Sequence, residues 1–289
     1  MTQGSWIVRK LMTLLATLAA VAAIVVVPAG AITNGDPDGE GHPYVGLVTF
    51  YDEAGVYLWR CSGTLMSPTV VLVAGHCTES PAESAQVWFD TGPIPAGNYP
   101  LTPVEDRPPC GTFTGWPCTG GDARGVPHTH PDYDPDAFFL HDLGVVTLTT
   151  PEGGITDRGF GALPEEGALS DLPKHASLTA VGYGLQKAFP DSASDKDEAV
   201  RVRLVAHPRI MAIDNKSVGD FAILTSHDAA RGGTCFGDSG GPNFIGDSNV
   251  VGAVTSFGTT DTCKGINGAY RVDQADDLTW LATFGLSPS

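Results

Sequence analysis

Short apolar runs rich in valine and threonine recur along the chain, and each ends near glycine, proline, aspartate or asparagine. Runs of this length between turn residues predict β-strands. The clearest cover residues 44–50, 69–75, 143–150, 177–184, 200–207 and 250–258. One segment, 273–285, favours a helix, because Leu278 and Leu281 lie three residues apart and Gly285 supplies a stop. The pattern predicts an all-β, barrel-like protein with a C-terminal helix.

Two segments lack this pattern. Residues 78–136 are rich in proline, glycine and aspartate, and residues 190–199 are mostly polar. Such composition is typical of solvated loops. We therefore expect long surface loops in both segments.

The N-terminus has a different pattern again. Arg9 and Lys10 precede an apolar run over 11–27, and the sequence PAGA follows with Ala29 and Ala31 at signal-peptidase spacing. The run is short of the roughly 20 residues that span a membrane. Residues 1–31 are thus predicted to be a secretory signal peptide, and the protein is expected to be secreted without a stable membrane anchor. A cut after Ala31 is favoured, and a cut after Ala29 is the alternative.

Bulk properties exclude some classes of function. The chain has 289 residues and a formal net charge of −17, whereas nucleic-acid-binding proteins normally present a basic face. Its 36 glycines and 22 prolines suit a loop-rich β protein. The residues after the leader suffice for one large β domain or two smaller halves.

Six cysteines follow the leader, and an even number in an exported chain predicts disulfides. Spacing alone does not choose among the possible pairings. No pair has the C-x-x-C spacing of zinc sites, so we expect neither a metal nor a cofactor. The six are Cys61, Cys77, Cys110, Cys118, Cys235 and Cys263.

The stretch GGTCFGDSGGP, residues 232–242, places Ser239 among glycines. Residues 237–241 fit the G-x-S-x-G elbow of α/β-hydrolases, but that design needs a histidine after the serine, and the last one is His227. The order Asp, His, Ser would need an early aspartate in a strand-end context, which the sequence lacks. The order His, Asp, Ser is met by His76, Asp142 and Ser239.

His76 ends the apolar run VVLVAGH, and Asp142 enters the run DLGVV. A carboxylate that enters an apolar strand will be buried and needs a partner, and the N–H of His76 would serve. His141 lacks this setting, and the aspartates of HPDYDPD, Asp132, Asp134 and Asp136, are expected in solvent or turns.

These blocks resemble the trypsin-like (chymotrypsin-fold) serine proteases, of a secreted bacterial type. VAGHC, HDLGVV and GDSGGP match the family's three catalytic blocks, and ITNG at 32–35 resembles its mature start, with Thr33 and Asn34 departing from the commonest form. The resemblance covers nearly all of residues 32–289. It implies two six-stranded antiparallel β-barrels, about 32–150 and 151–289, with the active site between them.

The resemblance also implies roles. Ser239 would be the nucleophile, His76 the base and Asp142 the residue that orients it, while the N–H groups of Gly237 and Ser239 would form the oxyanion hole. A new amine on Ile32 would pair with Asp238. Pairings implied by the family are Cys61–Cys77, Cys235–Cys263 and, for a small loop, Cys110–Cys118.

The primary pocket would be formed by Gly233, Ser256, Phe257, Gly258 and Gly268. It looks open and uncharged, which favours large apolar or aromatic residues before the cleaved bond. Asp261 keeps open a preference for lysine or arginine. Protein or peptide substrates and a monomeric state are expected. An inactive binding module, or an esterase with the same triad, remains the alternative.

Overall fold

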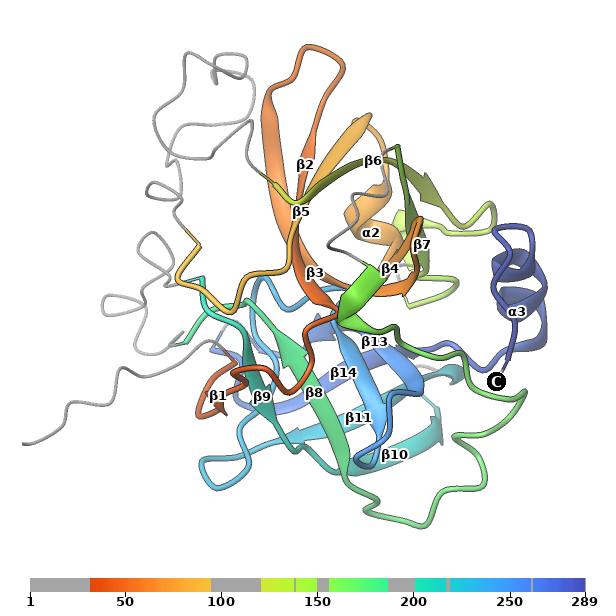
Figure 1. Cartoon of the computed structure of the whole chain (residues 1–289). Helices are drawn as coiled ribbons and strands as arrows, with labels where there is room; N and C mark the ends of the chain where they lie inside the picture. The colour runs from red at the N-terminus through yellow and green to blue at the C-terminus, as the bar shows by residue number, and fades with distance from the viewer. Residues whose placement is uncertain are drawn as a thin grey trace, which may run out of the picture.

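The computed structural model describes residues 32–94, 121–137, 139–149, 156–186, 201–216, 219–260 and 262–288. Six antiparallel strands close into a barrel in the order β2-β3-β4-β7-β6-β5, the upper half of Figure 1. Their bounds are β2 (Val45–Tyr51), β3 (Tyr57–Ser67), β4 (Val70–Val73), β5 (Ser84–Trp88), β6 (Ala123–Thr129) and β7 (Gly144–Leu148). Since β2 pairs with both β3 and β5, the ring is complete.

A second sheet lies below the barrel in Figure 1, with the order β1-β9-β8-β12-β13-β14-β11-β10. Its strands are β1 (Asp36–Pro37), β8 (Leu178–Gly182), β9 (Leu204–Ala206), β10 (Ile210–Asn215), β11 (Gly219–His227), β12 (Pro242–Ile245), β13 (Val251–Gly258) and β14 (Gly265–Arg271).

The all-β class with one closed six-stranded barrel is confirmed. The second unit differs from the expected six-stranded barrel, because it is an eight-stranded half-barrel over the described residues. One reason is that the N-terminal residues of β1 extend its edge by pairing with β9. Another is that a single bridge, between Ser177 and Arg209, stands where a ladder would join β8 to β10.

The two sheets share one hydrophobic core. Val71 and Val73 of the barrel belong to the same buried cluster as Val181, Phe244 and Val254 of the second sheet. Burial of β-branched side chains on both faces explains why β4 is apolar throughout instead of alternating. This shared core fixes the two sheets against each other, and the predicted site residues lie along their contact.

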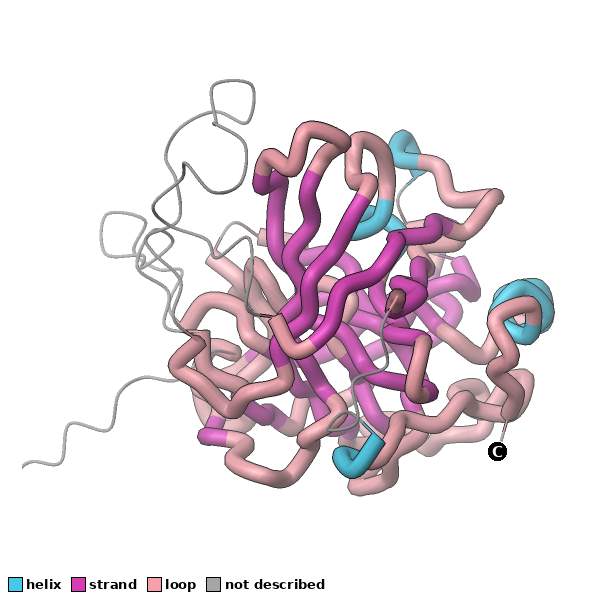
Figure 2. Tube along the Cα trace, turned by 45° about the horizontal axis from the view of Figure 1, so that its top comes forward, coloured by secondary structure: helices cyan, strands magenta, loops and turns pink. Residues whose placement is uncertain are grey.

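The expectation of loops throughout residues 78–136 was wrong at two places, since β5 and β6 lie within it. β6 reads ARGVPHT, and its neighbours β5 and β7 hold it as a strand despite its glycine and proline. The expected helix is confirmed as α3 (Ala275–Ala282). The helices are short, and α3 lies at the edge of the molecule, beside the strands (Figure 2). No helix among the described residues has both the length and the apolar character to span a bilayer.

Candidate active site

His76 lies on α2 (Gly75–Thr78), a single helical turn that follows β4 directly. β4 pairs with β7, with Val73 opposite Gly144, so the start of β7 brings Asp142 beside this turn. The disulfide Cys61–Cys77 joins the turn to β3 with an S–S distance of 2.01 Å, as the resemblance implied. Sheet register and a covalent bond together fix the position of His76.

Asp142 is fully buried, and three donors reach its carboxylate. The backbone N–H of His76 donates to Oδ1 at 2.9 Å, and His76 Nδ1 lies 3.0 Å from Oδ2. Ser256 Oγ on β13 donates to Oδ2 at 2.5 Å. Sequence reasoning assigned Ser256 to the substrate pocket alone and missed this bond, which joins the two sheets at the site.

This arrangement makes His76 more basic. Burial alone would lower the pKa of its imidazole, but the charge and hydrogen bonds of Asp142 outweigh burial, with a smaller contribution from Glu79, and the pKa is raised. Because Asp142 engages Nδ1, the other ring nitrogen, Nε2, is left to exchange a proton with a reacting group.

Ser239 lies on the second-sheet side of the same contact. Its carbonyl accepts the N–H of Ser62 at 2.8 Å, and Gly240 packs against the backbone of Ala74, two residues before His76. Ser239 and Ser256 line one cavity of about 260 Å³. Among the described residues no hydrogen bond joins Ser239 to His76, and such bonds commonly tighten only when substrate is present.

Gly237 has a backbone φ of +92°, which favours glycine. A Cβ at this position would also meet the guanidinium of Arg60 at 2.5 Å. Within the described part of the chain, the N–H groups of Gly237 and Ser239 donate to no acceptor. They are therefore available to an oxyanion. Arg60, which donates to the Tyr183 carbonyl at 2.7 Å, was not singled out from sequence.

Asp238 is buried completely, and its carboxylate accepts the N–H groups of Gly184 at 2.7 Å and Cys235 at 2.9 Å. Burial raises its pKa to about 7, against the opposing effect of these bonds and of the Arg60 charge. Ile32 is also fully buried, and Thr33 forms a bridge with Gly233. The segment that holds Ile32 thus runs beside the loop that carries Asp238.

The cavity beside Ser239 has no charged residue among its lining side chains, and Phe236 at its edge is 46% exposed. The wall residues are Thr234, Cys235, Phe236, Ser239, Thr255, Ser256, Phe257, Gly258, Thr260, Cys263 and Asn267. The disulfide Cys235–Cys263, with an S–S distance of 2.15 Å, forms part of this wall, as the resemblance implied.

Two of the predicted pocket glycines are covered by side chains. Gly233 packs against the imidazole of His227, and Gly268 packs against the ring of Phe257. Burial lowers the pKa of His227 to about 4, so this imidazole is uncharged near pH 7. Asp261, and the proposed pair Cys110–Cys118, lie outside the described residues.

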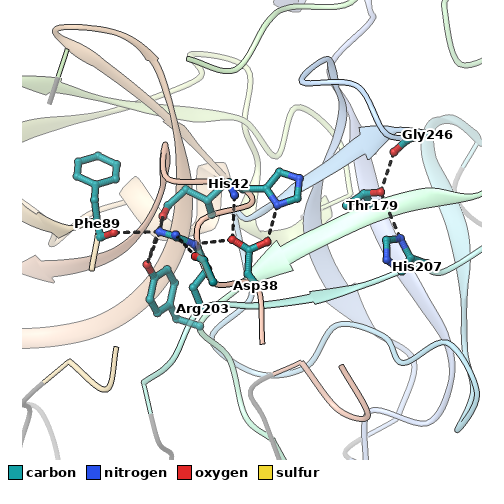
Figure 3. A network of polar contacts seen from close by, with 10 residues as sticks. Asp38, His42, Phe89, Thr179, Arg203, His207 and Gly246 are labelled. Atoms are coloured by element: carbon teal, nitrogen blue, oxygen red, sulfur yellow. Dashed lines mark hydrogen bonds and ion pairs between the residues drawn. The ribbon is translucent and has the colours of Figure 1, made fainter. Parts of the chain in front are cut away.

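A buried network anchors the segment that follows Ile32 (Figure 3). Arg203 Nε donates to Asp38 at 2.8 Å, while its Nη atoms donate to the carbonyls of Gly39 and Phe89. His42 lies 2.5 Å from the other Asp38 oxygen. Desolvation would raise the pKa of Asp38, but His42 and Arg203 hold it below its ordinary value. Asp38 is therefore the charged partner of both Arg203 and His42 in this network.

Known proteins resemble this chain in sequence and in fold. The chain is 28% identical to serine protease 1 of Drosophila melanogaster over 81% of this chain and 78% of that protein. It is 23% identical to kallikrein-1E2 of Equus caballus over 77% and 79%.

Among solved structures, a collagenase described as "HL collagenase" matches with a TM-score of 0.63 and 21% identity, over 89% of this chain and 100% of that chain. Human heparin binding protein matches with a TM-score of 0.60 and 18% identity, over 89% and 99%. These two share the fold. The family model described as Trypsin matches residues 121–279, more than half of the chain. The chain therefore belongs to the trypsin family of serine proteases.

Proposed function

We propose that this protein is a secreted serine endopeptidase that uses His76, Asp142 and Ser239 as its catalytic triad. The observation that carries the proposal is the buried Asp142 carboxylate, held by three donors and aligned on His76 Nδ1. A histidine held in this tautomer presents Nε2 as a general base.

The proposed reaction follows from these positions. Ser239 Oγ attacks the peptide carbonyl while His76 takes its proton, and the N–H groups of Gly237 and Ser239 stabilise the oxyanion. His76 then gives the proton to the leaving amine, and an acyl-enzyme remains on Ser239. Water, deprotonated by His76, attacks the acyl carbonyl and releases the new carboxyl end and Ser239.

The proposal includes activation by a cut before Ile32. Asp238 is a buried acid with two hydrogen bonds and a raised pKa, so a nearby cation would stabilise its charged form. An amine on Ile32 would supply one, and Ala31 ends the predicted leader. Signal peptidase would then produce the active chain without a second cut. N-terminal sequencing of the secreted protein tests this step, and a fully active chain that starts at Gly30 would contradict it.

We further propose cleavage after large apolar or aromatic residues. The support is a cavity with no charged lining residue, an apolar edge at Phe236, and an uncharged His227 beneath Gly233. A role in binding heparin, which its name gives to human heparin binding protein, has less support here, because heparin is a polyanion and this chain has a net charge of −17.

The test compares the secreted wild-type protein with Ser239→Ala on a mixed peptide library, with cleavage sites assigned by mass spectrometry. Cleavage by the wild type alone, after Phe, Tyr, Leu or Met, is expected. Cleavage after Lys or Arg would keep the triad and overturn the proposed preference. No cleavage by a chain that starts at Ile32 would overturn the endopeptidase, and ester hydrolysis in that case would identify an esterase.

A further inference from the structure

Three side chains of the kind that bind metals meet where the β6–β7 connection touches α3. His130 follows β6, His141 directly precedes Asp142, and Asp277 lies on α3. The N–H of His130 donates to the Leu143 carbonyl at 2.9 Å, which holds both ends of the connection together. Figure 1 shows α3 beside this connection, and the contacts below join the two.

The spacing of the ligand atoms suits a small cation. His130 Nε2 and His141 Nδ1 each lie 3.5 Å from Asp277 Oδ1, and all three atoms fall within 4.8 Å of one another. In tetrahedral zinc sites the metal lies about 2.0–2.1 Å from nitrogen and oxygen, which puts neighbouring ligand atoms about 3.4 Å apart. Two of the three separations are already close to this length.

Two of these atoms make no hydrogen bond. His141 Nδ1 and Asp277 Oδ1 are buried and accept or donate no hydrogen bond. Asp277 is fully buried, and the hydroxyl of Tyr270 donates to its other oxygen at 2.6 Å. A buried carboxylate oxygen without a hydrogen bond is unfavourable, and the two imidazole nitrogens at 3.5 Å are too far away to supply one. A cation between the three side chains would remove that cost, while Tyr270 fixes the carboxylate from behind.

The surroundings provide both order and access. His130 is 4% exposed, and its ring meets the edge of Trp280 with centroids 4.9 Å apart. The rings of His130 and His141 stack 9° from parallel with centroids 4.8 Å apart, so one ring must rotate before both can bind the same ion. Asp276 lies at the open side, with its side chain 58% exposed and Oδ2 3.8 Å from His141 Nδ1. It can attract a cation and, directly or through water, complete the coordination.

We propose that His130, His141 and Asp277 form a Zn²⁺ site, and that zinc bound there lowers peptidase activity. The second half rests on the function proposed above. Two imidazoles and one carboxylate are ligands that zinc binds well, whereas calcium prefers oxygen ligands alone. The early expectation of no metal considered only cysteine spacing, and the site arises from residues that are far apart in sequence.

The link to activity is the peptide bond between His141 and Asp142. His141 has a φ of +50°, and its carbonyl accepts the N–H of Leu143 at 2.7 Å, so it lies in a tight, constrained turn. Moving its ring towards the metal shifts this turn and the carboxylate that orients His76. The positive charge also opposes proton uptake by His76. Both effects slow proton transfer from Ser239.

Metal binding breaks one local hydrogen bond, which lowers the affinity of the site and makes the ion exchangeable. His130 Nδ1 accepts the N–H of Asp132 at 3.2 Å, so its proton resides on Nε2. Zinc replaces that proton, Nδ1 becomes protonated, and the bond to Asp132 is lost. We therefore expect a reversible site that responds to the zinc concentration, unlike a permanent structural centre.

The first arm of the test measures binding without activity. The secreted protein carrying Ser239→Ala, which prevents self-digestion, is titrated with ZnCl₂ in a calorimeter, and zinc per chain is measured after dialysis. One ion per chain is expected, with no comparable binding of CaCl₂. Adding His141→Asn or Asp277→Asn should weaken binding by about 100-fold or more.

The variants are chosen to fold. Asparagine tolerates the positive φ at 141, and an amide oxygen at 277 still accepts the Tyr270 hydroxyl. His175→Asn is the matched control, since His175 also has a positive φ (+64°) but is exposed. Near-ultraviolet circular dichroism checks each fold. No zinc binding by the parent protein, or equal affinity in the parent and both site variants, would overturn the site.

The second arm measures peptide hydrolysis by the protein with Ser239 intact. Inhibition should be half-maximal at the zinc concentration that half-saturates the calorimetric site, and EDTA should reverse it. A full rate at saturating zinc would overturn the regulatory half. A protein that hydrolyses nothing, with or without zinc, would contradict the proposed endopeptidase while the calorimetric result still decides the metal site.

Discussion

Two buried carboxylates lie on either side of His141, and they are bound in opposite ways. Both oxygens of Asp142 are engaged, by His76 and Ser256. Asp277 has one oxygen bound by Tyr270 and the other without a hydrogen bond, facing two imidazoles. A saturated carboxylate has a fixed orientation, which suits a residue that aligns a base. An unsaturated one leaves a place for a cation.

Asp238 stands between these two cases. Two backbone N–H groups satisfy its hydrogen bonding, but no ion pair with it is found among the described residues, and its pKa is raised to about 7. Its hydrogen bonds are therefore satisfied, but its negative charge has no ion-pair partner among the described residues. An amine added beside Asp238 would therefore have a large effect on the protonation of its carboxylate.

The largest expected effect comes from Asp142→Asn. An amide at this position favours the wrong tautomer of His76, and kcat should fall by about 10⁴-fold, as in serine proteases of this mechanism. Asp247→Asn, on an exposed turn, serves as the control for loss of a negative charge. Steady-state hydrolysis of a peptide substrate measures both, and an unchanged kcat for Asp142→Asn would place the orienting acid elsewhere.

The outline of the fold was predictable because local pattern and tertiary structure agree there. β4, β7, β8 and β13 lie within runs recognised by their β-branched residues, and β2 extends only one residue beyond its run. β6 was missed because Gly125 and Pro127 break the pattern, and only its two neighbours make it a strand. The edge strand β1 is two residues long and has no signal of its own.

The sequence suggests the proposed triad residues through recognisable blocks, but it does not reveal the side chains that surround them. His76, Asp142 and Ser239 lie in recognisable blocks, and the resemblance supplied the pairing of Cys61 with Cys77. Nothing local to Ser256 shows that its hydroxyl reaches Asp142, 114 residues away in the chain. The Phe257 ring on Gly268, and the meeting of His130 with Asp277, likewise depend on how distant segments pack.

A smaller loss of activity is expected when the hydroxyl that donates to Asp142 is removed, and a still smaller one when the hydroxyl that donates to Asp277 is removed. Ser256→Ala removes a hydrogen bond to a buried charge, and such bonds contribute about 1.5–3 kcal/mol. We expect kcat to fall by about 10- to 100-fold, with a smaller change in KM. Tyr270→Phe removes the donor to Asp277 and should cost less activity. Equal losses in the two variants would remove the distinction between the carboxylates.

Asp238 should make the uncut chain sensitive to pH. Its folded pKa is raised above the ordinary value of 3.8, so between about pH 4 and pH 7 the folded state holds more protons than the unfolded state. Its contribution to stability is therefore greatest at low pH and is lost as pH rises towards 7. Urea unfolding at pH 5 and pH 8, on the Ser239→Ala chain with its leader retained, measures this loss.

Two comparisons sharpen that experiment. Asp238→Asn in the same uncut chain should remove this component of the pH dependence. A chain that begins at Ile32 should lose it too, because the amine favours the charged carboxylate until the amine itself deprotonates at high pH. The same decline in stability in all three chains would contradict the role of Asp238.

The smallest effect is a displaced pH profile. Asp142 raises the pKa of His76, and the base must be neutral, so kcat/KM should rise with pH through a midpoint above 6.5. In Asp142→Asn the residual activity should show a lower midpoint. A midpoint that does not move between the two proteins would mean that another group titrates in the rate.

The central claim is that Ser239 is an activated nucleophile, and stoichiometric labelling tests it most directly. A fluorophosphonate reagent is added to the secreted chain that starts at Ile32, and intact mass and peptide mapping count and locate the label. We expect one label per chain, on Ser239, and none after Ser239→Ala. A folded chain that takes up no label, or takes it up equally in both proteins, would contradict the account.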